Sequence, residues 1–176
     1  MPYLLDTNVF ISGAKFYYPM KVFPGFWDWL EYEHKIGEFI LIDRVFHELQ
    51  GGDDLAIWTR ERLKPVSANI REYLDVIQCA DGKVLNQSGE RYRREAMEKF
   101  AKCADSYLIA HAKAENCTVV TYEKDAKSPT NVKIPTICED LQVPCITVLE
   151  LLRTLNPVFT WDSSAGEGGE PSETHH

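Results

Sequence analysis

The sequence predicts an α/β fold with three layers, in which helices cover both faces of a mostly parallel central sheet. Short apolar runs alternate with longer amphipathic segments, which is the pattern of strands joined by helical crossovers. The first run, residues 3–5, is continuously apolar, as in a parallel strand buried on both faces. The chain has 176 residues, of which 44% are hydrophobic, and this suffices for one domain with its own core.

The elements of the first half follow from apolar runs and from the residues that flank them. Gly13 is expected to end a short first helix, because glycine commonly follows the last helical residue. Asp43 is expected to act as the N-cap of a helix, because its side chain can accept a hydrogen bond from the first turn. The elements expected here are a strand at 3–5, a helix at 7–13, a helix ending near 33, a strand at 39–42 and a helix at 44–49.

The second half is expected to be mainly helical before the sheet resumes. Apolar residues at helical spacing predict the helices, and short runs rich in β-branched residues predict the strands. The elements expected here are helices at 55–63, 70–77 and 92–100, a helix beginning at 105, strands at 117–121 and 144–147, and a helix at 148–155.

The sequence divides into one domain over residues 1–156 and a flexible acidic tail over 157–176. The tail is rich in Gly, Ser and Glu from residue 163 to 174, a composition that lacks apolar side chains for a core. His175 and His176 resemble the remnant of a purification tag.

Composition excludes several classes of protein. No apolar stretch is long enough to span a bilayer, and the first residues lack the pattern of a secretion signal, so a cytoplasmic protein is expected. The five cysteines include no Cys-x-x-Cys pair, which argues for reduced thiols and against a thiolate zinc site. The net charge of −8 opposes non-specific binding to nucleic acid, although bound cations would offset part of it.

Four acidic residues stand where predicted elements begin or end, namely Asp6, Glu48, Asp105 and Glu123. Parallel sheets place functional groups at the carboxyl ends of their strands, so these side chains are expected to meet. Carboxylate oxygens are ligands that Mg²⁺ and Mn²⁺ prefer, and two such ions can promote phosphodiester hydrolysis. Taken singly, Asp105 could be only a helix cap and Glu48 only a solvated helix residue. Asp6 directly follows a buried strand and must be solvated, paired or bound to metal.

Further polar residues adjoin these acids. Thr7, Asn8 and Thr121 could hydrogen-bond the carboxylates, or could serve only as a helix cap and an ordinary strand residue. Asp125 competes with Glu123 for the role of fourth acid. His34, His47 and His111 lack metal-ligand spacing and receive no catalytic role.

These residues resemble the PIN domain, the nuclease fold of VapC-type toxins, over about residues 3–155. The chain is particularly similar to a PIN-like subgroup described only as a domain of unknown function. The resemblance implies a Mg²⁺- or Mn²⁺-dependent ribonuclease with RNA as substrate, often the toxin of a toxin–antitoxin pair, and a homodimer is expected. One residue departs from the pattern, because Glu123 stands where the family has Asp. The segments that carry the resemblance are 3–8, Glu48, 103–110, 119–123, the aromatic stretch 16–30 and Lys133–Cys138.

Other interpretations stay open. The aromatic residues between 16 and 29 could stack on RNA bases, bind an antitoxin or a second subunit, or pack in the core. A catalytically silent PIN-like module that binds RNA or a protein partner is the main alternative function. A phosphatase of the haloacid dehalogenase type also opens with an apolar strand and Asp, but Asn8 occupies the position where that family needs a second Asp.

Overall fold

Short parallel strands form the centre of the computed structural model, which describes residues 1–80, 92–125 and 128–160. Within these residues the sheet has four strands in the order β2-β1-β3-β4, and every neighbouring pair is parallel. Parallel neighbours require crossover connections, which the helices supply. The predicted three-layer α/β fold is therefore confirmed. The strands are β1 (Tyr3–Leu5), β2 (Phe39–Ile40), β3 (Thr118–Thr121) and β4 (Cys145–Thr147).

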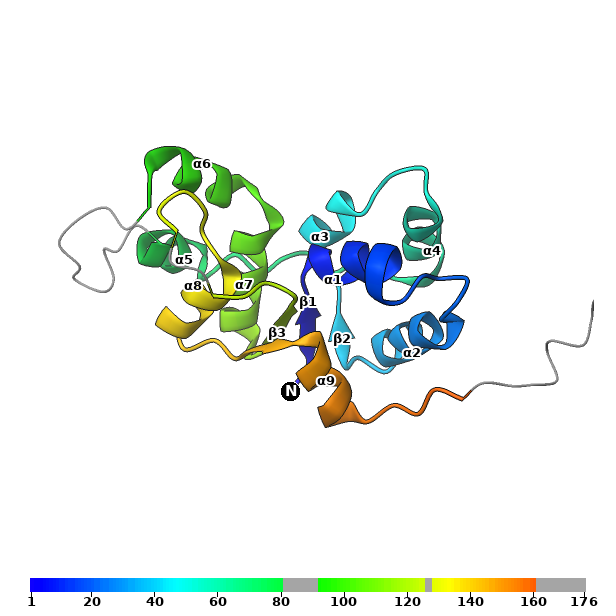
Figure 1. Cartoon of the computed structure of the whole chain (residues 1–176). Coiled ribbons are helices and arrows are strands. Elements are labelled where there is room, and N and C mark those ends of the chain that lie inside the picture. The colour runs from blue at the N-terminus through cyan, green and yellow to red at the C-terminus, as the bar shows by residue number, and fades with distance from the viewer. Residues whose placement is uncertain (81–91, 126–127, 161–176) are drawn as a thin grey trace, which may run out of the picture.

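Helices surround this sheet. Figure 1 shows α5 to α8 grouped beside β3 and α1 to α4 grouped beside β2, with the strands between the two groups. The helices are α1 (Thr7–Ser12), the π-helix η1 (Gly13–Tyr17), α2 (Pro24–Lys35), α3 (Asp43–Glu48), α4 (Asp54–Arg62), α5 (Tyr73–Ala80), α6 (Arg94–Lys102), α7 (Ala104–Glu115), α8 (Ile134–Asp140) and α9 (Val148–Leu155).

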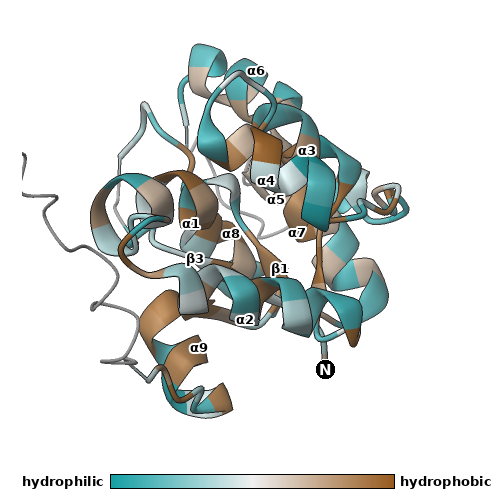
Figure 2. Cartoon of the chain, turned by 90° about the vertical axis from the view of Figure 1, so that its right-hand side faces the viewer, coloured by the Kyte–Doolittle hydropathy of each residue, from teal (hydrophilic) through white to brown (hydrophobic). Residues whose placement is uncertain are grey.

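The two central strands are the most deeply buried part of the sheet. All four residues of β3 are buried, and Leu4 of β1 is fully buried as well. Figure 2 shows these strands as hydrophobic ribbon in the interior. In α7, Leu108 and Ile109 are buried against the core, and small alanines on the same helix permit close packing. The continuous apolar runs thus reflect burial on both faces, as predicted.

Gly13 follows the last residue of α1 and is its C-cap, as predicted, but the chain does not leave the helical region there. Its φ of −55° is right-handed, and the chain continues through it into η1. The amide of Tyr18 donates to the carbonyl of Gly13 over 2.7 Å, which is the longer spacing of a π-helix. The indole of Trp27 donates to the carbonyl of Tyr18 over 2.8 Å and so fixes the end of η1. Gly13 thus ends the α-helical hydrogen bonding without the left-handed conformation that glycine often adopts after a helix.

Asp43 is the first residue of α3 and not its N-cap, a position that Ile42 occupies. Its carboxylate instead accepts a hydrogen bond of 3.2 Å from the amide of Ala68. The segment near Val66 runs beside the end of β2, where Val66 forms a parallel bridge with Ile42. The prediction failed because this partner segment is distant in sequence.

The remaining boundaries differ modestly, and two helices, η1 and α8, are not among the predicted elements. The predicted helix at 70–77 begins at Tyr73, and α9 has the predicted bounds. The start of α8, Lys133-Ile134-Pro135, carries part of the family resemblance, but the sequence analysis predicts no helix there. Proline is compatible with the first turn of a helix, where its missing N–H is not needed. The buried residues Ile134, Ile137 and Cys138 follow the helical spacing that could have revealed it.

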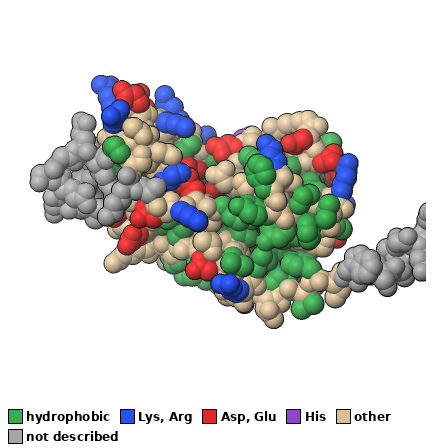
Figure 3. Space-filling view, in the orientation of Figure 1, with side chains coloured by type: hydrophobic (Ala, Val, Ile, Leu, Met, Phe, Trp, Pro, Cys, Tyr) green, Lys and Arg blue, Asp and Glu red, His purple; other side chains and the backbone are tan. Residues whose placement is uncertain are grey.

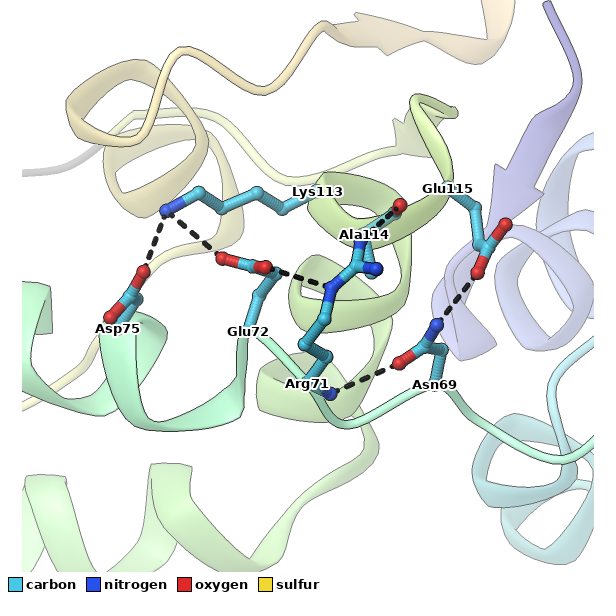
Figure 4. Close-up of polar contacts among 7 residues, drawn as sticks. All are labelled: Asn69, Arg71, Glu72, Asp75, Lys113, Ala114 and Glu115. Carbon is cyan, nitrogen blue, oxygen red and sulfur yellow. Dashed lines mark hydrogen bonds and ion pairs between the residues drawn. The ribbon is translucent and has the colours of Figure 1, made fainter.

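A polar network ties α5 and the segment before it to α7 (Figure 4). Lys113 Nζ lies 3.1 Å from Asp75 and 3.6 Å from Glu72. Arg71 lies 3.1 Å from Glu72 and donates to the carbonyl of Ala114 over 2.8 Å. Because α7 carries Asp105 at its other end, these contacts help to fix the helix that presents this acid.

The chain beyond α9 remains packed for a few residues. Phe159, which lies past the predicted domain boundary at residue 156, contacts the rings of Phe26 and Trp29 with centroids 6.4 and 6.1 Å apart. The rest of the predicted tail, residues 161–176, lies outside the described residues.

All five cysteines are free thiols and three of them are buried, as expected. In the part of the chain that the structure describes, no helix has the length and apolar character needed to cross a membrane.

Candidate functional site

Asp6 stands at the end of β1 and is only 1% exposed. Its amide donates to the carbonyl of Val120 over 3.0 Å, so the backbone stays paired with β3. Its carboxylate accepts a hydrogen bond of 2.8 Å from the hydroxyl of Thr121, which ends β3. Burial raises the pKa of Asp6 to about 6, while hydrogen bonds from Thr121 and Asn8 oppose this rise and the charge of Glu123 adds to it.

Asp105 lies in the first turn of α7 and is half-buried. Burial raises the pKa of its carboxyl to about 7, and the negative charges of Asp6, Glu123 and Glu48 raise it further. Repulsion of this kind requires that the carboxylates lie near one another. The four acids that the sequence singled out therefore converge on one site between the carboxyl ends of β1 and β3 and the start of α7.

Glu48, at the end of α3, joins two other helices through its carboxylate. One oxygen accepts a hydrogen bond of 2.6 Å from the hydroxyl of Thr7 in α1. The other oxygen accepts a hydrogen bond of 3.0 Å from the amide of Ala104, the first residue of α7. The N-cap residue Cys103 makes no side-chain cap of its own, so Glu48 satisfies an amide that the helix leaves unpaired.

Glu123 is also held by donors of the protein. Lys133 Nζ lies 2.7 Å from one of its oxygens, and both side chains are mostly shielded, with 22% and 15% exposed. The other oxygen accepts a hydrogen bond of 3.0 Å from the amide of Ile134, the first residue of α8. Glu123 thus caps α8 and pairs with a lysine while its charge still acts on Asp6 and Asp105.

The supporting residues divide between the site and its surroundings. Thr7 donates to Glu48 and Thr121 donates to Asp6, and Asn8 contributes by lowering the pKa of Asp6. The Thr121 hydroxyl also accepts from the amide of Glu123 over 3.0 Å. Asp125, in contrast, accepts a hydrogen bond from the hydroxyl of Thr136 in the first turn of α8. Of the two candidates for fourth acid, the charge of Glu123 is the one that reaches Asp6 and Asp105.

Two carboxylates of the site, those of Asp6 and Asp105, can serve as ligands of Mg²⁺ or Mn²⁺. Among residues 1–80, 92–125 and 128–160, no group of three or more His, Cys, Asp or Glu side chains is arranged to hold a metal ion. The reason is visible in the contacts, because Glu48 and Glu123 direct their oxygens at protein donors. Mg²⁺ is commonly held by one or two carboxylates and keeps several waters. Asp6 and Asp105, which lack a cationic partner in the described residues, fit that pattern.

Lys133 is the residue of the site that the sequence did not reveal. The segment around this lysine carries part of the family resemblance, but the sequence indicates no partner for its side chain. The ion pair joins residues on either side of a loop, and only the folded chain brings them together. A lysine directly before the start of a buried helix was the available signal.

We expect Lys133→Met to lower the free energy of unfolding by about 1–2 kcal/mol, because Glu123 would keep a shielded charge without its partner. Lys133→Arg is expected to retain most of the stability. Thermal denaturation at pH 7 measures the effect. Lys113→Met, which removes a lysine paired with Asp75 on α5 and with Glu72 just before this helix, is the matched control. A melting temperature of Lys133→Met equal to that of the wild type would contradict the structural role of this pair.

The predicted aromatic cluster separates into buried and exposed rings. Phe26 and Trp27 are 2% exposed and belong to the core, as one of the interpretations held. Phe16, Tyr17 and Phe23 are exposed. Figure 3 shows, in the orientation of Figure 1, a broad hydrophobic area on one face of the molecule, with acidic side chains between the two groups of helices.

One exposed ring lies close to the site. Tyr17 stacks on Tyr122 with ring centroids 4.6 Å apart, and Tyr122 lies between Thr121 and Glu123 in sequence. The exposed ring of Tyr17 therefore lies beside the segment that carries Thr121 and Glu123.

The histidines contribute to the structure outside the acidic site. His34 hydrogen-bonds the carbonyl of Phe39 and accepts from the amide of Lys64, at 2.9 Å in both cases. His111 accepts from the amide of Asn69 over 2.9 Å. Burial lowers the pKa of His111, which agrees with a neutral ring that accepts a hydrogen bond.

The fold and the site together define an α/β protein with an acidic centre at the carboxyl ends of parallel strands. The chain matches the family described as a domain of unknown function (DUF4411) over residues 3–159. It belongs to this family, since the match covers most of its length. No curated protein and no solved structure matches the chain.

Proposed function

We propose that the protein is a divalent-metal-dependent endoribonuclease that hydrolyses phosphodiester bonds of RNA. One observation carries the proposal: hydrogen bonds bring acids from four separate segments together at the ends of parallel strands, since Thr121 joins Asp6 to Glu123 and Glu48 joins the residues next to Asp6 and Asp105. Burying like charges together is costly unless a cation relieves the repulsion. Such an arrangement is more typical of a functional site than of a structural one.

The residues of the site have distinct roles in this proposal. A bound Mg²⁺ or Mn²⁺ would lower the pKa of a water and neutralise charge on the phosphate. Asp6 and Asp105 would hold the ion directly, and the hydroxyl of Thr121 would keep the Asp6 carboxylate oriented. Glu48 would act from its position between α1 and α7, through water. Glu123 would hold Lys133 beside the site, where the ammonium attracts the phosphate backbone.

The proposal extends to the biological role on the strength of the PIN-domain resemblance. We place the protein in the cytoplasm as the toxin of a toxin–antitoxin pair, with an antitoxin protein and a second copy of the chain as partners. The exposed rings of Phe16, Tyr17 and Phe23 support a partner that covers apolar surface of this chain. Light scattering at high protein concentration tests the second copy, and a strict monomer would contradict it.

The test of the proposed activity is cleavage of a mixed RNA pool by the purified protein. We expect cleavage with Mn²⁺ or Mg²⁺, none with EDTA, and none by Asp105→Asn. Asp28→Asn removes an exposed acid on α2, away from the site, and is the matched control, which should cleave at the rate of the wild type. Cleavage that persists both in EDTA and in Asp105→Asn would refute the proposal.

A catalytically silent module that binds RNA or protein is the second candidate. It is favoured by the protein donors that engage Glu48 and Glu123 and leave two acids for a metal. Calorimetry separates the candidates. Saturable binding of Mn²⁺ that Asp105→Asn abolishes would count against the silent module, and its absence would count against the nuclease.

A further inference from the structure

A fixed positive charge, the ammonium of Lys133, adjoins the acidic site. Its nitrogen lies 2.7 Å from a carboxylate oxygen of Glu123, and the two side chains are only 22% and 15% exposed. The amide of Glu123 donates to the hydroxyl of Thr121 over 3.0 Å, and this hydroxyl donates to Asp6 over 2.8 Å. Short contacts therefore join the lysine, through the end of β3, to the buried acid that follows β1.

The carboxylates of Glu123 and Glu48 already have a donor for each of their oxygens. Glu123 accepts from Lys133 with one oxygen and from the first amide of α8 with the other. Glu48 accepts from a hydroxyl of α1 and from the first amide of α7. A metal ion that used either carboxylate would compete with these donors. Asp6 and Asp105 have no cationic partner in the described residues, so they remain as the ligands of an ion.

A second ion beside Glu123 would also meet a like charge. In two-ion sites the cations stand roughly 3.5–4 Å apart, so both need ligands within one small site. Glu123 is the acid whose charge acts on both Asp6 and Asp105, which makes it the ligand that such an ion would use. Its ammonium partner is largely shielded, and solvent ions screen a shielded charge less than an exposed one. Lys133 therefore repels a divalent ion from this position.

We propose that the site binds one divalent ion, held by Asp6 and Asp105, and that the ammonium of Lys133 takes the place of a second ion. This inference rests on the proposed function and assigns the lysine its role in it. In sites with two ions, the second one neutralises charge on the reacting phosphate. Lysine binds phosphate as a point charge, so a fixed ammonium can supply the same neutralisation. Glu123 is then a positioning residue that holds this ammonium and not a ligand of the metal.

The number of bound Mn²⁺ ions tests the inference without any need for catalysis. Electron paramagnetic resonance counts them, because the signal of hydrated Mn²⁺ decreases when the ion binds to protein. We expect one ion per chain in the wild type and two in Lys133→Met, in which Glu123 has lost its cation. The two ions should show spin coupling, which an ion bound elsewhere would not show. Lys133→Arg keeps the positive charge and should bind one ion.

Two further variants serve as controls for the count. The double variant Lys133→Met/Glu123→Gln removes the carboxylate that would receive the second ion, so it should bind one ion again. Lys35→Met removes the lysine from Glu31, a buried glutamate outside the site that keeps Arg62 at 2.8 Å. It is the matched control and should bind one ion. Unfolding would remove the site and lower the count, so a gained ion does not come from loss of the fold.

Cleavage of RNA provides a second measurement that a purely structural lysine would not affect. At limiting Mn²⁺, Lys133→Met is expected to cleave about 100-fold more slowly than the wild type, the usual effect of losing one group that stabilises charge. Its rate should recover as the Mn²⁺ concentration is raised, because an ion then occupies the place of the ammonium. A rate that stays low at every Mn²⁺ concentration would contradict the replacement.

The outcomes separate this inference from the proposed activity. Two coupled ions in the wild type, or a single ion in Lys133→Met, would overturn the inference and leave the nuclease standing if cleavage depends on metal. A wild type that binds no Mn²⁺ would overturn both. If the counts are as expected but RNA is not cleaved, the single-ion site stands and the nuclease proposal fails.

Discussion

As the pH rises from about 4 to about 7, Asp105 is expected to lower the free energy of unfolding of the metal-free protein. The pKa of Asp105 is raised from 3.8 to about 7 in the folded protein, mainly by burial and by the neighbouring acids. Between these values the folded state holds a proton that the unfolded state has lost. Stability decreases with pH wherever the folded state binds more protons.

The effect should reach a few kcal/mol, since each unit of pKa shift corresponds to about 1.4 kcal/mol. Asp6, with a pKa raised to about 6, contributes with the same sign over a narrower range. The penalty is absent below about pH 4 and complete above about pH 7. Urea denaturation of the metal-free protein from pH 4 to pH 8 measures it.

Asp105→Asn is the control that isolates this contribution. The variant carries no charge at this position, so it should be more stable than the wild type at pH 8 and closest to it near pH 4. Other groups titrate in both proteins, among them Glu31, whose pKa is lowered chiefly by its hydrogen bond with Lys35. The difference between the two profiles removes their contribution. A difference that does not increase with pH would show that Asp105 is not held among like charges.

Asp6→Asn is expected to lower the rate of metal-dependent RNA cleavage by more than about 100-fold. This exceeds the roughly 10- to 100-fold loss that follows removal of a group that only orients a ligand. Asp6 is buried at the end of β1, and its carboxylate is one of the two proposed to hold the ion. Cleavage under single-turnover conditions and calorimetric titration with Mn²⁺ both report the loss.

Thr121→Val provides the graded comparison. It removes the hydroxyl that donates to Asp6 over 2.8 Å while keeping the shape of a buried side chain. We expect a loss of roughly 10- to 100-fold, intermediate between the wild type and Asp6→Asn. If Thr121→Val were as defective as Asp6→Asn while its melting temperature fell sharply, the defect would come from the fold and not from the orientation of Asp6.

Local signals in the sequence located the parts of the site that depend on one element. A carboxylate directly after a buried apolar strand, as at Asp6, and one at the start of a helix, as at Asp105, are visible without a structure. Parallel strands with helical crossovers then require that such positions share one edge of the sheet. The fold class and the convergence of the acids were predictable for this reason.

Features that depend on contacts between distant segments were not predictable. The bond from Glu48 to Ala104 spans 56 positions in sequence, and no periodicity encodes it. The π-helix η1 follows Gly13 and ends where Trp27 donates to Tyr18, and β2 ends at Ile40, before Ile42 forms its bridge with Val66. Both features involve residues that are distant in sequence, which local preference does not encode.

The carboxylate of Glu48 has a consequence for how the site responds to ligands. Its oxygens accept hydrogen bonds from the hydroxyl of Thr7 and the amide of Ala104. A ligand that binds this carboxylate must therefore break its contact with α1 or with the beginning of α7. Occupancy of the centre and fraying of that helix start are thus thermodynamically linked. Deuterium uptake at the Ala104 amide would register an arriving cation even in a variant that has lost all turnover.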